Sequence, residues 1–204
     1  MGFKDLRNKR TSLDGDTILH AYQKAMEELF NHKLDAAVRI LTTETYSKAI
    51  VYVESVEAAK QLTGRLQEKY GLSEVASLVG KGDMSMDQQA SALFHFRHGA
   101  RILICTSIGE EGLDIPSADL EIWIDPPNNP RKWIQRFGRI LRQPGDKKLA
   151  KTIALVSNQT HEKAKLLNVK KNVEKTYGFT QRMKKAAYRT LSKNQETITD
   201  YLSP

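Results

Sequence analysis

The chain has 204 residues, a formal net charge of +8, 40% hydrophobic residues and a single cysteine. These values exclude a disulfide scaffold, a collagen-like chain and a fully disordered chain, and one cysteine with five histidines predicts no metal site of the zinc-finger type. Six of the eight net positive charges lie between residues 158 and 204, where ten Lys/Arg accompany four Asp/Glu. Such a basic segment suits a polyanion such as nucleic acid, and a solvated helix face is the alternative.

The N-terminal residues are charged from Lys4 onward, without the apolar stretch of a secretion signal, and no apolar run reaches membrane-spanning length. We therefore expect a soluble, cytoplasmic protein without a membrane partner, nucleoid-associated if its source is prokaryotic. Cys105 follows three apolar residues, which indicates a small buried hydrophobe.

Apolar runs alternate with amphipathic stretches from residue 49 onward, which predicts strand and helix units around a parallel sheet. A lead-in helix is expected over residues 17–46. The expected strands cover residues 49–53, 75–79, 101–106, 120–124 and 152–156. The expected helices between them cover residues 57–70, 85–99 and 130–141, and a basic helical segment follows residue 160.

Three of these helix ends carry recognisable capping residues. Gly71 is placed to end the second helix, and Ser85 with Gln88 has the form of a capping box. Asn129 and Pro130 supply an N-cap and a proline in the first helical turn.

The segment ICTSIGEEGLDIP, residues 104–116, follows the third expected strand and contains two glycines and three carboxylates. A glycine-bearing loop at the C-terminal end of such a strand lets backbone amides approach phosphate or ribose closely. The Asp114 carboxylate could accept from a sugar hydroxyl, while Thr106 and Ser107 could donate to a phosphodiester oxygen. A hydrogen-bonded turn is the structural alternative.

A second candidate site is QRFGRILR, residues 135–142. On a helix Arg139 and Arg142 share a face, so two guanidinium groups could converge on one phosphate. Arg136 extends the stripe, and Gly138 permits close approach of another backbone or a ligand. A solvated helix face is again the alternative.

Residues 48–157 resemble the second RecA-like domain of superfamily 2 helicases, with its motifs IV, V and VI in order. The resemblance is carried by the segments IVYVES, GKGDMSMDQQASALFHFRHG, ICTSIGEEGLDIP and QRFGRILR. The TSIGEEGLDIP segment is similar to the Hef-like archaeal DNA helicases, and the QRFGRILR segment is similar to the XPB-like repair helicases. The resemblance implies an α/β fold, a RecA-like parallel sheet flanked by helices, here with a helical C-terminal extension. The expected parts are a helical lead-in (1–34), the RecA-like domain (35–160), a basic helical extension (161–194) and a tail (195–204).

The resemblance also implies roles for individual residues. Arg139 and Arg142 match the arginine fingers that reach the γ-phosphate of ATP on the preceding domain, and Gln135 matches a residue that orders the nucleotide and the attacking water. The matching nucleotide-binding positions are Gly112, Asp114 and Arg136. The positions matched to nucleic-acid backbone contacts are Ser55, Lys81, Gly82, Thr106 and Ser107.

The sequence contains no G-x-x-x-x-G-K-S/T loop and no DExH-type motif in the matching place. We therefore expect ATP as cofactor, with its Mg²⁺ held by a separate N-terminal motor domain, in cis or in trans. The chain is then an excised C-terminal half or a separate subunit, and alone it should hydrolyse ATP negligibly. The expected function is the second motor domain of an ATP-dependent DNA helicase or translocase. The alternatives are a non-catalytic, clamp-tethered nucleic-acid adaptor and half of an RNA-dependent ATPase.

The last ten residues contain a further short pattern, Q-x-x-I/L/M-x-x-F/Y-F/Y/L, at Gln195, Ile198, Tyr201 and Leu202. It resembles the peptide that docks DNA-metabolism proteins into the sliding clamp PCNA. The three apolar side chains would lie on one side of a helical turn and fill an apolar pocket, with the glutamine hydrogen-bonded beside it. A terminal amphipathic turn is the alternative. The peptide favours DNA over RNA as the substrate.

Overall fold

The computed structural model describes residues 15–80, 82–106, 113–140, 150–157 and 160–177. The α-helices are α1 (Gly15–Thr43), α2 (Val56–Tyr70), α3 (Met86–His98), α4 (Pro130–Ile140) and α5 (Glu162–Tyr177), with a short 3-10 helix, η1 (Leu72–Glu74). The strands are β1 (Ala49–Tyr52), β2 (Val75–Leu78), β3 (Ile102–Cys105), β4 (Leu120–Trp123) and β5 (Lys151–Ala154). The predicted order of helices and strands is confirmed, and their ends lie within three residues of the expected ones.

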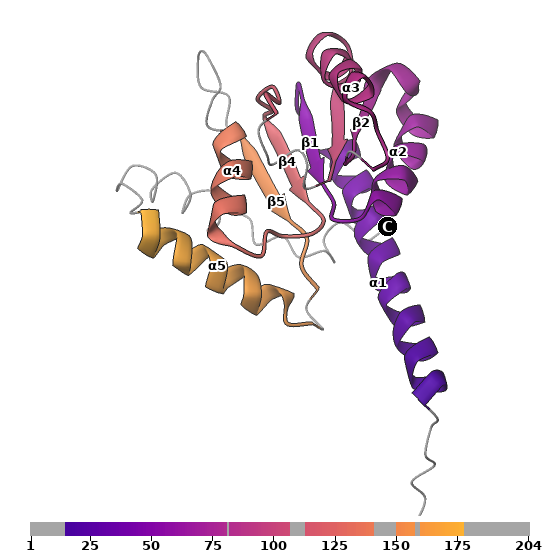
Figure 1. Cartoon of the computed structure of the whole chain (residues 1–204), viewed down its shortest axis with the longest axis vertical. Coiled ribbons are helices and arrows are strands. Elements are labelled where there is room, and N and C mark those ends of the chain that lie inside the picture. Colours follow the sequence, from indigo (N-terminus) through magenta and orange to yellow (C-terminus); the bar gives the residue numbers. More distant parts are fainter. Residues whose placement is uncertain (1–14, 81, 107–112, 141–149, 158–159, 178–204) are drawn as a thin grey trace, which may run out of the picture.

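The five strands form one parallel sheet in the order β2-β3-β1-β4-β5 (Figure 1). The sheet with its flanking helices confirms the predicted RecA-like α/β architecture. The strands are in register, so their last residues form one row across the sheet, made of Leu78, Cys105, Tyr52, Trp123 and Ala154. Every segment that follows a strand therefore starts from the same edge.

Helices cover both faces of the sheet. Alternate strand residues such as Val51 and Ile122 pack with Leu34 of α1 and Leu62 of α2 on one face. The intervening residues, among them Tyr52, pack with α3 and α4 on the other face. Both faces are buried because β1, β3 and β4 are apolar along most of their length, as parallel strands covered on two sides are.

The predicted caps are present. Gly71 ends α2 with a φ of +93°, a conformation that favours glycine. The capping box of Ser85 and Gln88 starts α3. The Asn129 Oδ1 accepts from the Lys132 N–H at 2.9 Å at the start of α4.

The lead-in helix and the sheet domain are joined by one continuous helix. Helix α1 runs through residues 34 and 35 without a break, and its N-terminal part extends away from the sheet (Figure 1). Its C-terminal part belongs to the core, since Leu34, Ala37 and Ile40 are fully buried. The buried Lys33 Nζ donates to the Ile124 carbonyl oxygen at 3.2 Å and to Glu162 Oε1 at 2.7 Å. This lysine therefore connects α1, the end of β4 and the start of α5.

Candidate functional site

The C-terminal edge of the sheet collects the segments that contain most of the predicted site residues. Hydrogen bonding continues one residue past the strands: the N–H of Thr106 donates to the Leu78 carbonyl at 3.1 Å, and the N–H of Leu155 to the Trp123 carbonyl at 2.8 Å. The main chain is therefore fixed up to the point where the loops begin. Open parallel sheets bind their ligands outside this edge.

Two predicted nucleic-acid contacts are exposed at this edge and a third is buried. Ser55 is exposed and caps α2, with its Oγ accepting from the Ala58 N–H at 3.0 Å. A helix N-terminus with a hydroxyl cap attracts anionic groups such as phosphates. Gly82 is also exposed, and a Cβ there would meet nothing within 4 Å. Thr106 is only 4% exposed, so in this arrangement its hydroxyl does not face solvent.

Asp114 lies on the segment that returns from β3 along α3. Its side chain is 89% exposed, and Arg97 Nη2 lies 3.2 Å from Oδ2 and 3.1 Å from the Asp114 carbonyl oxygen. A pair this exposed is worth less than about 1 kcal/mol in stability. The pair holds the segment near α3, and the exposed carboxylate can still accept a hydrogen bond from a hydroxyl of a ligand.

Arg139 lies on α4 and turns toward the same segment. Its side chain is almost buried, with 8% exposure, and Nη1 donates to the carbonyl oxygens of Leu113 and Ile115, both at 3.5 Å. Bonds of this length are at the weak limit for N–H to oxygen, and a phosphate oxygen is a stronger acceptor for guanidinium. The structure thus brings Arg139 together with the residues on either side of Asp114.

Arg136 has an internal position on α4. It is 1% exposed and donates from Nη1 to the Asp125 carbonyl oxygen at 2.7 Å. Its guanidinium carbon lies 4.7 Å from the ring centroid of Tyr52 and 6.0 Å from that of Trp123. These contacts tie α4 to the sheet, so in this arrangement the guanidinium binds groups of the domain itself, and its predicted contact with nucleotide stays a prediction.

A buried carboxylate, Glu121 on β4, lies beside the two arginines. It is fully buried, and its Oε2 accepts from the Trp123 indole N–H at 3.2 Å, while Oε1 has no hydrogen-bond partner among the described residues. Burial raises the pKa of Glu121 to about 8, against the opposing effects of the Trp123 hydrogen bond and of Arg136 and Arg139.

Tyr52 completes this buried polar cluster. Burial, with Glu121 as the next cause, raises the pKa of Tyr52 well above its usual range. Sequence reasoning missed Glu121. The signal was present, because a single acid stands inside the apolar run LEIWI, at a position whose neighbours are all buried.

The other predicted residues divide into two groups. Gln135 is half-buried on α4, the same helix as Arg139. Gly138 lies on this helix too, and a Cβ there would meet nothing within 4 Å, so the described chain makes no close approach to it. Lying outside the described residues are Lys81, Ser107, Gly112, Arg142, Gln195, Ile198, Tyr201 and Leu202.

The described residues include neither a candidate metal site nor a candidate membrane-spanning helix. Within them, no three His, Cys, Asp or Glu side chains gather in a way that could hold a metal ion. None of the described helices combines the length and apolar character needed to cross a membrane.

The family model of the helicase conserved C-terminal domain matches residues 32–143. The ATP-dependent DNA helicase mph1 of Neurospora crassa is 34% identical over 164 residues, which are 77% of this chain and 13% of that protein. The ATP-dependent rRNA helicase SPB4 of Meyerozyma guilliermondii is 27% identical over 135 residues, 64% of this chain and 22% of that protein. The chain thus spans less than a quarter of the length of either relative.

The fold is also shared with solved structures. The C-terminal domain of the DEAD-box protein Dbp5 superposes with a TM-score of 0.59 at 22% identity, over 79% of this chain and 91% of that chain. This similarity establishes the arrangement of sheet and helices.

Proposed function

The chain belongs to the helicase conserved C-terminal domain family, and on that basis we propose that it is the second motor domain of an ATP-dependent superfamily 2 DNA helicase or translocase. The relative from Neurospora crassa, which is named as an ATP-dependent DNA helicase, supports DNA as the substrate. The proposed role of the chain is to supply cationic groups to ATP bound on another domain and to hold nucleic-acid backbone.

The position of Arg139 is the observation that carries this proposal. Its guanidinium donates at 3.5 Å to two carbonyl oxygens of the segment that also contains Asp114. An ATP γ-phosphate brought up by a second domain would offer stronger acceptors, so the guanidinium would exchange carbonyl oxygens for phosphate oxygens as the domains close. Charge that develops on the transferred phosphoryl group is then stabilised by a cation that was already in place.

ATP and its Mg²⁺ need further ligands that this chain does not supply. The sequence lacks the phosphate-binding loop, so the proposal assigns the phosphates and the metal to a separate N-terminal motor domain. The exposed Asp114 carboxylate is suited to accept from a ribose hydroxyl, and Gln135 stays assigned to ordering the attacking water. Arg142 is proposed as the second arginine finger.

Nucleic acid is proposed to bind along the C-terminal edge of the sheet. Ser55 and Gly82 are exposed there, and the capped start of α2 favours a phosphate group. Lys81, Thr106 and Ser107 belong to the same proposed set. Contacts to phosphates position a strand without reading its base sequence, as a translocating motor requires.

The decisive experiment mixes the full chain with an N-terminal helicase motor domain that carries the phosphate-binding loop, and measures DNA-stimulated ATP hydrolysis. We expect the chain alone to be inactive and the mixture active. Removal of an arginine finger typically costs about 10³-fold or more in kcat, so Arg139→Ala should abolish most of the activity. Arg131→Ala is the matched control, because Arg131 is an exposed arginine on the same helix.

Activity that survives Arg139→Ala would contradict the arginine-finger assignment. Nucleic-acid binding without any reconstituted ATP hydrolysis would favour the alternative of a non-catalytic adaptor. Similarity to the rRNA helicase from Meyerozyma guilliermondii keeps an RNA-dependent ATPase as the second candidate. Single-stranded RNA replacing DNA in the same assay separates the two substrates.

The C-terminal tail is proposed to dock into the PCNA sliding clamp. The support is the sequence pattern at Gln195, Ile198, Tyr201 and Leu202. Binding of the full chain to purified clamp should be lost with Tyr201→Ala and kept with Ser203→Ala. Equal binding by the Tyr201 variant and the unaltered chain would rule the docking peptide out.

A further inference from the structure

Helix α5 presents four exposed lysines and has a net positive charge. The helix contains five lysines and two glutamates, and the exposed lysines are Lys163, Lys165, Lys171 and Lys175. Among the described residues none of these four makes an ion pair. By contrast, Lys33 of α1 pairs with Glu162, the first residue of α5, and Lys60 pairs with Asp83. Five lysines against two glutamates leave α5 with a net charge of +3, which favours an anionic partner.

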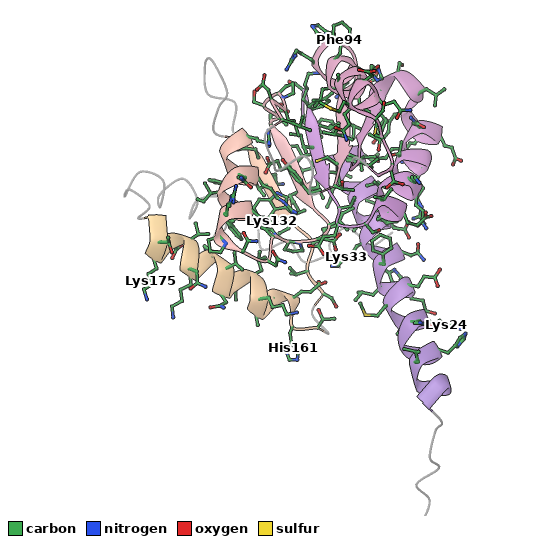
Figure 2. All side chains as sticks on the ribbon, viewed as in Figure 1. Lys24, Lys33, Phe94, Lys132, His161 and Lys175 are labelled. Atoms are coloured by element: carbon green, nitrogen blue, oxygen red, sulfur yellow. The ribbon has the colours of Figure 1, made fainter. Side chains whose placement is uncertain are left out.

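The inner face of α5 packs against the domain. Val169 is 6% exposed and Val173 is fully buried, and α5 lies beside α4 (Figure 1). Lys175 projects from the far end of α5, away from the sheet (Figure 2). The exposed lysines thus stand on a helix packed against the domain.

The start of α5 lies at the C-terminal edge of the sheet. Glu162 accepts from the buried Lys33 through Oε1 at 2.7 Å and from the Ser157 N–H through Oε2 at 2.9 Å. The same Lys33 donates to the carbonyl oxygen of Ile124, the residue that follows β4. The first lysines of α5 therefore begin at the edge where nucleic acid is proposed to bind.

We propose that the outer face of α5, formed by Lys163, Lys165, Lys171 and Lys175, is an accessory binding surface for nucleic-acid backbone that continues from the C-terminal edge of the sheet. The inference rests on the proposed function, which places nucleic acid at that edge. A 16-residue helix is about 24 Å long, which is the axial rise of about seven phosphates in one strand of a duplex.

The chemistry of the face favours a polyanion over an anionic membrane. A helix that lies on a membrane turns its apolar side toward the lipid. On α5 the apolar Val169 and Val173 face the domain instead, and the solvent side presents four lysines around a single large apolar side chain, Leu167, which is 55% exposed. Lysine ammonium groups bind phosphate as point charges without demanding a fixed geometry, so the surface should bind nucleic acid without base specificity.

The test measures binding of the full chain to a fluorescent single-stranded DNA of about 30 nucleotides, by anisotropy, between about 0.05 and 0.3 M KCl. Each lost contact to a single strand lowers the slope of log affinity against log salt by about 0.7, which is about fivefold in affinity at 0.1 M salt. Lys171→Gln with Lys175→Gln should therefore lower the slope by about 1.4 and the affinity about 25-fold.

Two further variants make the result specific. Lys24→Gln with Lys69→Gln removes the same charge from exposed positions on α1 and α2, and should leave the slope unchanged. Replacing Lys171 and Lys175 by arginine keeps the charge and should keep the slope, which separates loss of charge from loss of fold.

If the Lys171/Lys175 variant and the Lys24/Lys69 variant lost equal DNA affinity, the proposal would be overturned, because affinity would then follow net charge alone. Unaltered DNA binding combined with lysine-dependent binding to phosphatidylserine vesicles would overturn it in favour of a membrane. The measurement needs neither ATP nor a second motor domain. Its failure is therefore distinct from failure of the helicase proposal, which is decided by Arg139→Ala in the hydrolysis assay.

Discussion

Replacing Glu121 by glutamine keeps the size of a fully buried side chain and removes its ability to ionise. The native carboxyl sits on β4 between the sheet and α4, beside Arg136 and Arg139. Two effects compete there, since desolvation opposes its negative charge and the two guanidinium groups favour it. Burial is the larger effect and raises the pKa of Glu121 from its ordinary value of 4.5 to about 8.

The sign of the stability change follows from this shift. Below pH 4.5 the carboxyl is protonated in both the folded and the unfolded chain, so it contributes no pH dependence. Between pH 4.5 and 8 the unfolded chain ionises while the folded chain holds the proton, so rising pH works against folding. The buried carboxyl therefore lowers the free energy of unfolding by ~3 kcal/mol at pH 7 and by ~5 kcal/mol above pH 9. Glu121→Gln should therefore match the native chain at low pH and be more stable by these amounts at higher pH.

Urea unfolding followed by tryptophan fluorescence at pH 4.5, 7 and 9 measures the difference. Glu68→Gln, which neutralises an exposed glutamate on α2, should change the free energy of unfolding by less than about 0.5 kcal/mol. A glutamine variant that is less stable at pH 7 and approaches the native chain only in acid would refute the reasoning. That result would mean that attraction to Arg136 and Arg139 outweighs desolvation.

Five further substitutions probe the packing of the domain. Arg136→Ala removes a buried side chain that joins α4 to the sheet, and should lower the free energy of unfolding by about 3–5 kcal/mol in urea; a loss below about 1 kcal/mol would contradict the internal role. Lys33→Met leaves Glu162 without its buried partner and should cost about 3 kcal/mol, and adding Glu162→Gln should recover part of that loss, which a double-mutant cycle measures. Gly138→Ala and Gly64→Ala each replace a helical glycine with open space around it, so both should raise stability by up to about 1 kcal/mol. Of these two, only Gly138→Ala should reduce reconstituted ATP hydrolysis, because α4 is the helix that is proposed to meet the second motor domain; equal activities would place the domain contact elsewhere.

The site residues depend on one another through the sheet. Arg136 and Arg139 are three residues apart on α4, yet Arg136 holds the helix to β1 and β4, while Arg139 reaches the segment beside Asp114. We therefore expect a change in the buried cluster of Tyr52, Glu121 and Arg136 to affect Arg139 as well. This coupling explains why a stability measurement on Glu121 bears on a residue assigned to ATP.

Much of the fold was predictable from local patterns. The apolar runs at 49–53 and 120–124 predicted buried parallel strands, and Gly71, the Ser85 capping box and Asn129 placed helix ends closely. These features depend on neighbours a few residues apart, so the sequence alone contains their physical cause. Asp114 and Arg139 were predicted in two separate candidate segments, which the family resemblance assigned to the same nucleotide, and the structure places these segments in contact.

Only the tertiary structure shows that Arg136 and Arg139 contact different parts of the domain. Helical spacing puts both arginines on one stripe, but the direction in which each guanidinium points depends on what the sheet offers it. Arg136 meets the ring of Tyr52 and a carbonyl oxygen at the end of β4, while Arg139 meets the segment after β3. The sequence by itself determined the composition of the strands and the ends of the helices. Burial of Glu121 and the ion pair of Lys33 with Glu162 depend on residues far apart in the chain. Both features therefore exist only once the folded sheet has brought those residues together.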